Sequence, residues 1–378
     1  MKAFSIVLVL VGAVAFVLGL TSADPAHTWS IYLVNVLFWS GIAATGPAIA
    51  AIMQLTEARW SPSVRRIALT TAGFLPVAFA LLIVLILGSD MLWAWVKPER
   101  FQGHARQLVD AKAAWLNLPF FWGRTLVLAV ALFVTCFAFV RALLSDPMPP
   151  DSERERARRN RLAVILLFLW IITLSLWGYD LVMSLDPTWY SGLFGGYFVV
   201  TAMYTTFCML SILTVSANAR GLASIPPAAV QDVAKLQFAL SIIWMYFFWS
   251  QYLVIWYGNV PIETRYLLRR FFVEPWRTLA WVVLIVGWLI PFIYLLKRLT
   301  GRPPQRHTPL VVMAVFGLVA IFLERVFLVF PSVMTDNSFL GIKDVLVTLG
   351  FFGLFILSRR WFIDRFKPVL NLPHTGMH

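Results

Sequence analysis

Hydrophobic runs dominate this chain and recur ten times, with polar gaps between them. They cover about residues 4–20, 28–55, 66–88, 118–143, 160–184, 189–216, 235–257, 276–296, 308–330 and 340–358. Each is close to the 20 or so mainly apolar residues that a helix needs to cross a bilayer. A helix is also one of the few structures that pair every backbone group inside lipid. The pattern therefore predicts an all-α polytopic membrane protein, with about ten transmembrane helices in one integral membrane domain over residues 1–378.

The first run has a second interpretation. Lys2, the apolar stretch after it and the small residues at 21–23 also suit a cleavable signal peptide. The run is long for the apolar core of such a signal, so we expect it to be retained as a helix. The sequence leaves the alternative of cleavage open.

Lysine and arginine gather in alternate gaps. One set of gaps, together with the two termini, holds 20 of these residues and the other set holds 9, while Arg124 and Arg325 lie within runs. Because positive residues are enriched on the cytoplasmic side, both termini are predicted to be cytoplasmic. The segment 144–160 is then a cytoplasmic linker, since Pro149-Pro150 followed by mixed charge is typical of solvated chain. The segment 89–117, with its Trp93-Ala94-Trp95 string, is a long external loop that we expect to pack on the membrane surface or against a partner.

Composition changes this picture little. Hydrophobic residues make up 60% of the chain and charged residues only 13%, against about 25% charged in a soluble domain. The net charge of +13 would suit nucleic acid, but the basic residues lie in short gaps between apolar runs. They indicate topology, and no nucleic acid is expected as a partner.

Metal and haem ligands are sparse in the apolar runs. Cys136 and Cys208 stand alone, without a CxxC motif, which excludes a cysteine-ligated zinc or iron–sulfur site. The five histidines, at 27, 104, 307, 374 and 378, fall in predicted gaps or at the terminus, whereas haem b between helices needs histidines inside the spans. We therefore expect no cofactor held covalently or by metal ligation. Any redox role would use a diffusing lipid-soluble carrier such as quinol, together with the cofactors of a partner.

Polar residues within the runs are the functional candidates, because such groups are costly in lipid. In the predicted topology they lie toward the outer face: Asn35, Arg124, Asp180, Gln251, Tyr252, Glu324, Arg325 and Asp344. Interhelical ion pairing is the alternative reading for the charged residues Arg124, Glu324, Arg325 and Asp344. Asp180 is the candidate proton acceptor, since a carboxylate near a membrane face can take a proton from a quinol hydroxyl and pass it to water.

Other candidates lie where spans end. Asp186 and Trp189 belong to the turn 186–189, in which Asp and Pro favour a purely structural role. Asn259 ends the seventh span, again with a structural alternative, and Glu263 follows it. Gln251 and Tyr252 could bind a quinone carbonyl, although hydrogen bonds between helices are the commoner use of such residues.

Several strings along the chain carry a resemblance. They are GYDLVMSLDPTWYS at 178–191 with FGGY at 194–197, YLVN at 32–35, ARW at 58–60, VRRIA at 64–68, KAAWLN at 112–117, PFF at 119–121 with Arg124, and SQYLVIWYGNVP at 250–261. In this order and spacing the chain resembles the NrfD-like membrane subunits of alternative complex III. More narrowly it is similar to the second of the two, the ActF subunits, which are described as quinone-binding.

This resemblance implies an α-helical subunit, without bound cofactors, in the bacterial cytoplasmic (inner) membrane. It implies a quinol-oxidising complex, with menaquinol as one candidate substrate, whose other members are a sister NrfD-like subunit, an iron–sulfur subunit, and multihaem and monohaem cytochrome c subunits. A terminal oxidase is a further potential partner.

The chain departs from the family pattern at two places. Thr188 stands where relatives usually have histidine, and Pro261-Ile262-Glu263 replaces Pro-Glu-Glu. Both changes make the sister subunit, by family analogy, the stronger candidate for quinol oxidation itself. Two other functions remain open: a secondary transporter, which predicts inverted repeats and midplane sites, and the NrfD-like anchor of a polysulfide-reductase-like complex.

Overall fold

The computed structural model describes residues 2–58, 62–144, 152–299, 307–334 and 339–366. Over these ranges the chain is helical and contains no strand, and ten helical segments are long and apolar enough to cross a membrane. The prediction of an all-α polytopic membrane protein is confirmed. Residues 59–61 and most of the predicted linker, 145–151, lie outside the described residues.

Seven of the ten segments are single helices. They are α1 (Lys2–Leu20), α2 (Pro25–Leu55), α7 (Leu118–Leu144), α9 (Phe194–Ala219), α10 (Pro227–Gly258), α14 (Thr308–Val333) and the last segment, α15 (Ile342–Arg365). Short helices α6 (Gly103–Ala111) and α11 (Pro261–Phe271) lie in the two long gaps.

Three segments change their helical pitch on the way. The third consists of α3 (Pro62–Leu69), η1 (Thr70–Phe74), α4 (Leu75–Leu85), η2 (Ile86–Gly88) and α5 (Ser89–Leu92). The fifth runs from α8 (Glu153–Trp177) through the π-helical turn η5 (Gly178–Val182) to η6 (Met183–Leu185). The eighth runs from α12 (Trp276–Leu284) through a second π-helical turn, η7 (Ile285–Leu289), to α13 (Ile290–Leu299). Two short 3-10 turns, η3 (Ala94–Val96) and η4 (Pro98–Arg100), follow α5.

Two helices, α2 and α8, begin earlier than the apolar runs predict, because capping groups extend them into the polar gaps, whereas α9 begins at Phe194, later than the predicted 189. α2 begins at Pro25, where the Asp24 side chain accepts a hydrogen bond from the backbone of His27. α8 begins at Glu153 after Ser152 caps it in the same way. Such caps satisfy backbone donors that a helix start leaves open.

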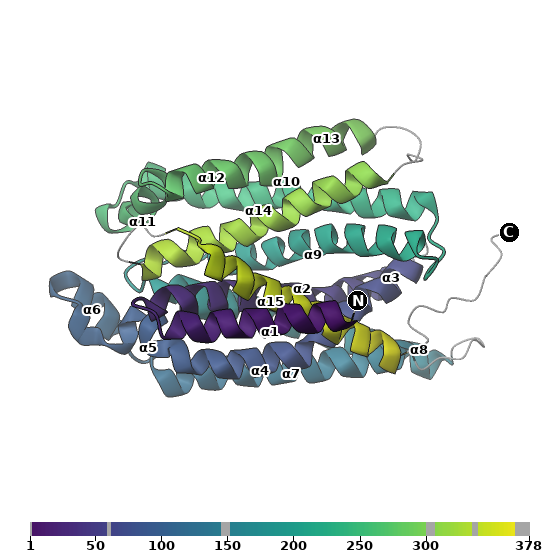
Figure 1. Cartoon of the computed structure of the whole chain (residues 1–378), viewed down its shortest axis with the longest axis horizontal. Coiled ribbons are helices and arrows are strands. Elements are labelled where there is room, and N and C mark those ends of the chain that lie inside the picture. The colour runs from purple at the N-terminus through teal and green to yellow at the C-terminus, as the bar shows by residue number, and fades with distance from the viewer. Residues whose placement is uncertain (1, 59–61, 145–151, 300–306, 335–338, 367–378) are drawn as a thin grey trace.

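The helices form two groups with a central element. α2, α4, α7 and α8 pack together, and α9, α10, α12–α13 and α14 form the second group, seen in blue and in green on opposite sides of Figure 1. α2 contacts both groups, and 94% of its most apolar 18-residue window is buried. The central position of α2 explains why it carries so many small residues.

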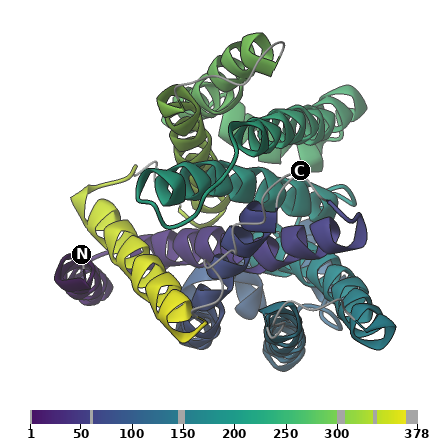
Figure 2. The same cartoon turned by 90° about the vertical axis from the view of Figure 1, so that its right-hand side faces the viewer.

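α1 and α15 pack against each other at one side of the molecule (Figure 2). At their contact Gly12 meets Gly350 so closely that a Cβ on Gly12 would lie 2.5 Å from the Gly350 Cα. Small residues allow this approach, which drives helix association in lipid through packing.

The external loop differs from its prediction. Trp93 and Trp95 are buried in the protein itself, with ring centroids 5.1 Å and 5.2 Å from Phe121 on α7. Their aromatic surface is covered by α7, so the beginning of this loop is part of the fold. α6 extends from the same end of the molecule as α11, while the beginning of α1 and the end of α15 point to the other end (Figure 1).

Candidate functional site

The candidate residues fall into three separate polar groups, each buried between helices. One surrounds Asp180, one surrounds Asp344, and one surrounds Glu324. The three groups are held by different helix contacts, so they form three sites and not one.

The Asp180 group is a buried ion pair. In the π-helical turn η5, Asp180 accepts hydrogen bonds from Arg124 Nε (2.7 Å, at Oδ2) and Arg124 Nη2 (2.8 Å, at Oδ1). Trp115 Nε1 donates a third, 3.1 Å from Oδ1, and its ring lies under the guanidinium at 4.1 Å. The side chain of Arg124 is 8% exposed and that of Asp180 2%. Bidentate pairs of this kind are among the stronger polar contacts in proteins.

This geometry joins two predictions. The interhelical ion pair expected for Arg124 exists, and its partner is the residue expected to accept protons. Both Asp180 oxygens are already engaged, so a structural role of Asp180 is well supported and any proton transfer must compete with the guanidinium.

The Asp344 group links α2 to α15. Asp344 Oδ2 lies 2.9 Å from His27 Nε2 and accepts a hydrogen bond from the backbone of Gly341 at 2.7 Å. About two turns further along α2 and one turn along α15, Asn35 Nδ2 donates to Thr348 Oγ1 at 3.1 Å. The predicted interhelical pairing of Asp344 is thus present, and Asn35 serves the helix contact.

The expected place of His27 in a gap was wrong. His27 lies in the first turn of α2, because the Asp24 cap begins this helix before the apolar run. His104 lies in α6, within the external gap 89–117 where it was expected. Neither position places a histidine in the middle of a span.

The Glu324 group is the most deeply buried. Glu324 and Arg325 are adjacent on α14 and 0% and 3% exposed, with Arg325 Nη1 3.6 Å from Glu324 Oε2. Adjacent helical residues point in different directions, so the expected interhelical pair was wrong here. Instead the Tyr197 hydroxyl of α9 donates to Glu324 Oε1, and the Arg325 guanidinium lies 4.0 Å from the Phe198 ring.

A small cavity of about 40 Å³ lies next to this group, large enough for water. Three predicted residues, Trp189, Gln251 and Tyr252, line it. Its other lining residues are Phe194, Tyr197, Phe248, Ile255, Tyr266, Leu267, Arg270, Phe271, Phe327 and Leu328. In this cavity a candidate from the turn after span five, Trp189, meets the candidates Gln251 and Tyr252 from span seven.

Two residues that line the cavity, Arg270 and Tyr266, were not predicted from the sequence. Arg270 is 1% exposed and donates to Leu328 O (2.9 Å) and Ser332 Oγ (2.7 Å). Tyr266 lies between the Arg270 guanidinium, 3.5 Å from its ring, and Trp189, whose ring stacks on it at 3.8 Å. Both were assigned to an external gap. The spacing of Tyr266, Leu267 and Arg270, which places them on one face of a helix, was the signal for their burial.

Burial also sets the protonation of these two side chains. It raises the pKa of Tyr266 to about 12, although the neighbouring Arg270 opposes this change. It lowers the pKa of Arg270, while Tyr266 and Asp186 act in the opposite direction. At neutral pH the cavity therefore presents a phenol that is a hydrogen-bond donor, beside a guanidinium.

The remaining predicted residues have structural contacts. Asp186 Oδ1 accepts from Thr188 Oγ1 at 2.6 Å within its turn, as the structural interpretation expected. Asn259 has φ 46° and ends α10 in the left-handed conformation. Glu263 lies in the first turn of α11 and is not a lining residue of the cavity.

Within the described part of the chain, no three His, Cys, Asp or Glu side chains come together as metal ligands do. The sequence matches no protein-family model, and no curated protein matches it. The function is therefore inferred from the strings and from where the structure places them.

Proposed function

We propose that this protein is the membrane subunit of a quinol:electron-acceptor oxidoreductase of the alternative complex III type. In this role it binds quinol, or supports quinol oxidation and proton transfer by a sister NrfD-like subunit. Electrons pass to iron–sulfur and cytochrome c partner subunits. Ten helical segments long and apolar enough to cross a membrane support this proposal, because quinol is a lipid-soluble carrier.

The observation that carries this proposal is the convergence of the strings that resemble the family. Trp115 and Arg124 come from the strings around span four, and both hydrogen-bond Asp180 in the string at 178–191. Lys112 Nζ donates to Pro187 O at 2.6 Å, which joins the same two regions again. Two segments that carry the resemblance, and that lie far apart in the sequence, thus contact each other in the fold.

The string at 250–261 reaches the neighbouring cavity. Gln251 and Tyr252 line it together with Trp189 and Tyr197, which belong to the strings at 178–191 and 194–197. Side chains that support one another in space are expected to vary together, so a resemblance spread over all of them is more specific than any one string.

Purification from the native membrane tests the proposal. The tagged full-length protein, extracted in mild detergent, should bring iron–sulfur and haem-containing subunits with it and oxidise quinol. Haem absorbance, iron content and the subunit bands measure this. If the protein elutes alone, without haem absorbance or iron, the proposal fails.

A further inference from the structure

An apolar groove runs along the second group of helices, between α10 and α12 with η7. Its volume is about 610 Å³, which lies in the range of small-molecule sites. The lining residues are Met245, Phe248, Trp249, Tyr252, Phe271, Phe272, Arg277, Ala280, Trp281, Leu284, Ile285, Trp288 and Leu289. Seven of these are aromatic, so the groove offers flat surfaces to a ring and smooth walls to a hydrocarbon chain.

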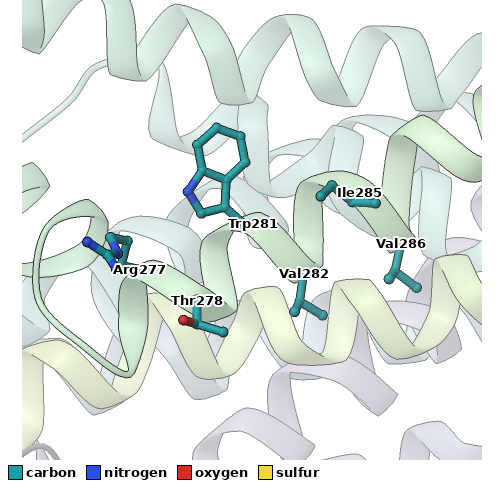
Figure 3. Close-up of a pocket in the computed structure, with 6 residues that line it drawn as sticks. All are labelled: Arg277, Thr278, Trp281, Val282, Ile285 and Val286. Carbon is teal, nitrogen blue, oxygen red and sulfur yellow. The ribbon is translucent and has the colours of Figure 1, made fainter.

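The groove is open at the outer surface of the helices. Trp249 is 50% exposed and Trp281 61% exposed at its edges. Figure 3 shows that Trp281 extends from one side of the segment formed by α12 and η7, whereas Val282 and Val286 extend from the other. The depression that Figure 3 shows is lined by α12 and η7 alone, so it is a feature of one helix surface and forms no site of its own.

Two polar groups in the groove have no hydrogen-bond partner among the described residues. The Tyr252 hydroxyl has no hydrogen-bond partner among these residues, and its ring packs against those of Trp249 and Phe271. Trp288 Nε1 is buried and unpartnered, in the π-helical turn η7. Five other tryptophan Nε1 atoms of the described residues are also buried without a partner, so the distinctive features of this groove are the Tyr252 hydroxyl and the π-helical turn, a kind of turn that is frequent at functional sites. These donors suit a ligand that accepts hydrogen bonds.

Charge selects the class of ligand. Arg277 is the one charged residue in the lining, and its Nε already pairs with Glu274 Oε1 at 2.8 Å. The phosphate of a phospholipid bound in the groove would find no unpaired positive side chain among the lining residues. A neutral ring with carbonyl or hydroxyl oxygens meets the unpartnered donors without this cost.

The groove also adjoins the Glu324 group. Phe248, Tyr252 and Phe271 line both the groove and the small cavity. On the cavity side of these three residues lies Tyr197, hydrogen-bonded to Glu324. A ring bound at Tyr252 would therefore be separated by these three side chains from the cavity, whose Tyr197 reaches the buried Glu324 carboxylate.

We propose that this groove binds one molecule of a prenyl quinone or quinol, with the ring at Tyr252 and the isoprenoid chain along α12 and η7. The identity of the ring rests on the proposed function; the place does not. The site lies in the second group of helices and is separate from Asp180, where the first group holds its ion pair.

Photo-crosslinking tests the place directly. The full-length protein, with any subunits that co-purify, is put into phosphatidylcholine nanodiscs and irradiated with an azido-quinone, and labelled peptides are mapped by mass spectrometry. We expect labels within 245–252 and 271–289, and competition by unlabelled quinone. This measurement uses the unaltered protein and does not depend on any variant folding.

Two variants sharpen the result, each with a matched control on α10. Leu284→Trp fills the groove and should abolish labelling, whereas Leu253→Trp, on an exposed position outside the lining, should not. Tyr252→Phe removes one hydrogen bond and should weaken binding about three- to tenfold. Tyr246→Phe, at another exposed tyrosine outside the groove, should leave binding unchanged.

The outcomes separate this inference from the proposed function. Labels confined to peptides around Asp180, or a phospholipid in the groove that quinone does not displace, overturn the inference even in a haem-containing complex. A protein that purifies without haem or iron but carries the label at 245–252 overturns the proposed function and supports the inference.

Discussion

At the scale of single residues, burial and pairing decide what each charged group can do. Asp180 was selected as a proton acceptor by its position near a membrane face. The structure adds two hydrogen bonds from Arg124 and one from Trp115. Once a carboxylate is held in this way, removing it changes packing as well as chemistry, so stability and activity must be measured together.

Replacing Asp180 with asparagine should leave the Arg124 guanidinium buried without a counter-charge. We expect the free energy of unfolding to fall by about 3–5 kcal/mol, as when one partner of a buried pair is removed. Thermal unfolding of the purified protein in detergent measures this, and quinol oxidation by the intact complex should fall as well.

The double variant Asp180→Leu with Arg124→Met is the control, because it removes both charges. It should recover most of the lost stability. A single Asp180→Asn variant that unfolds like the native protein, yet loses quinol oxidation and its pH dependence, would instead assign Asp180 to proton transfer. Unchanged turnover would leave only a structural role.

At the scale of elements, close helix contacts replace the hydrophobic effect that drives packing in water. α1 and α15 illustrate this, since much of the surface of α1 faces outward and its contact depends on Gly12 and Gly350. In lipid, such a contact is stabilised by van der Waals packing at short range. One added side chain is therefore enough to separate the two helices.

Gly12→Leu should detach α1 from α15. Cysteines placed at Leu8 and Leu346, whose backbones lie beside this contact, should be crosslinked by a bifunctional maleimide in the native background and lose most of this crosslinking in the variant. Gly123→Leu, on α7, is the control, because nothing lies within 4 Å of its Cβ position. Equal crosslinking in the Gly12 variant and in the control would refute the packing argument.

At the scale of the whole molecule, the charge asymmetry predicts orientation. Twenty Lys and Arg residues lie on one set of gaps and termini and nine on the other. The structure agrees in arrangement, since α6 and α11 lie at the end opposite to the beginning of α1 (Figure 1). Which end faces the cytoplasm is a prediction that the positive-inside rule supplies.

Cysteine accessibility in intact cells tests this orientation. The native Cys136 and Cys208 are both buried, so we expect maleimide labelling to report only the introduced cysteine. We expect Gln107→Cys, exposed on α6, to react with a membrane-impermeant maleimide from outside. Glu155→Cys, exposed at the beginning of α8, should react only after the cells are opened. The reverse pattern would invert the topology.

Many of the residues in the buried polar groups and the cavity could be predicted from the sequence. Asp180, Arg124, Gln251, Tyr252 and Glu324 stand out as polar residues in apolar runs, and each has a defined place in a buried group or a cavity wall. Arg270 and Tyr266 do not stand out in this way, because polar residues in a gap are ordinary. Their burial depends on α11 folding back against α14, which no local pattern records.

The ten spans, the all-α class and the predicted orientation follow from the sequence by itself. Hydropathy and charge belong to each residue, and a window of about 20 residues is enough to predict a span. The side-chain partners of the polar residues cannot be predicted in this way. Arg124 meets Asp180 across 56 residues, Tyr197 meets Glu324 across 127, and Asn35 meets Thr348 across 313. Only the tertiary structure decided these contacts, because they depend on how each helix is rotated and packed against its neighbours.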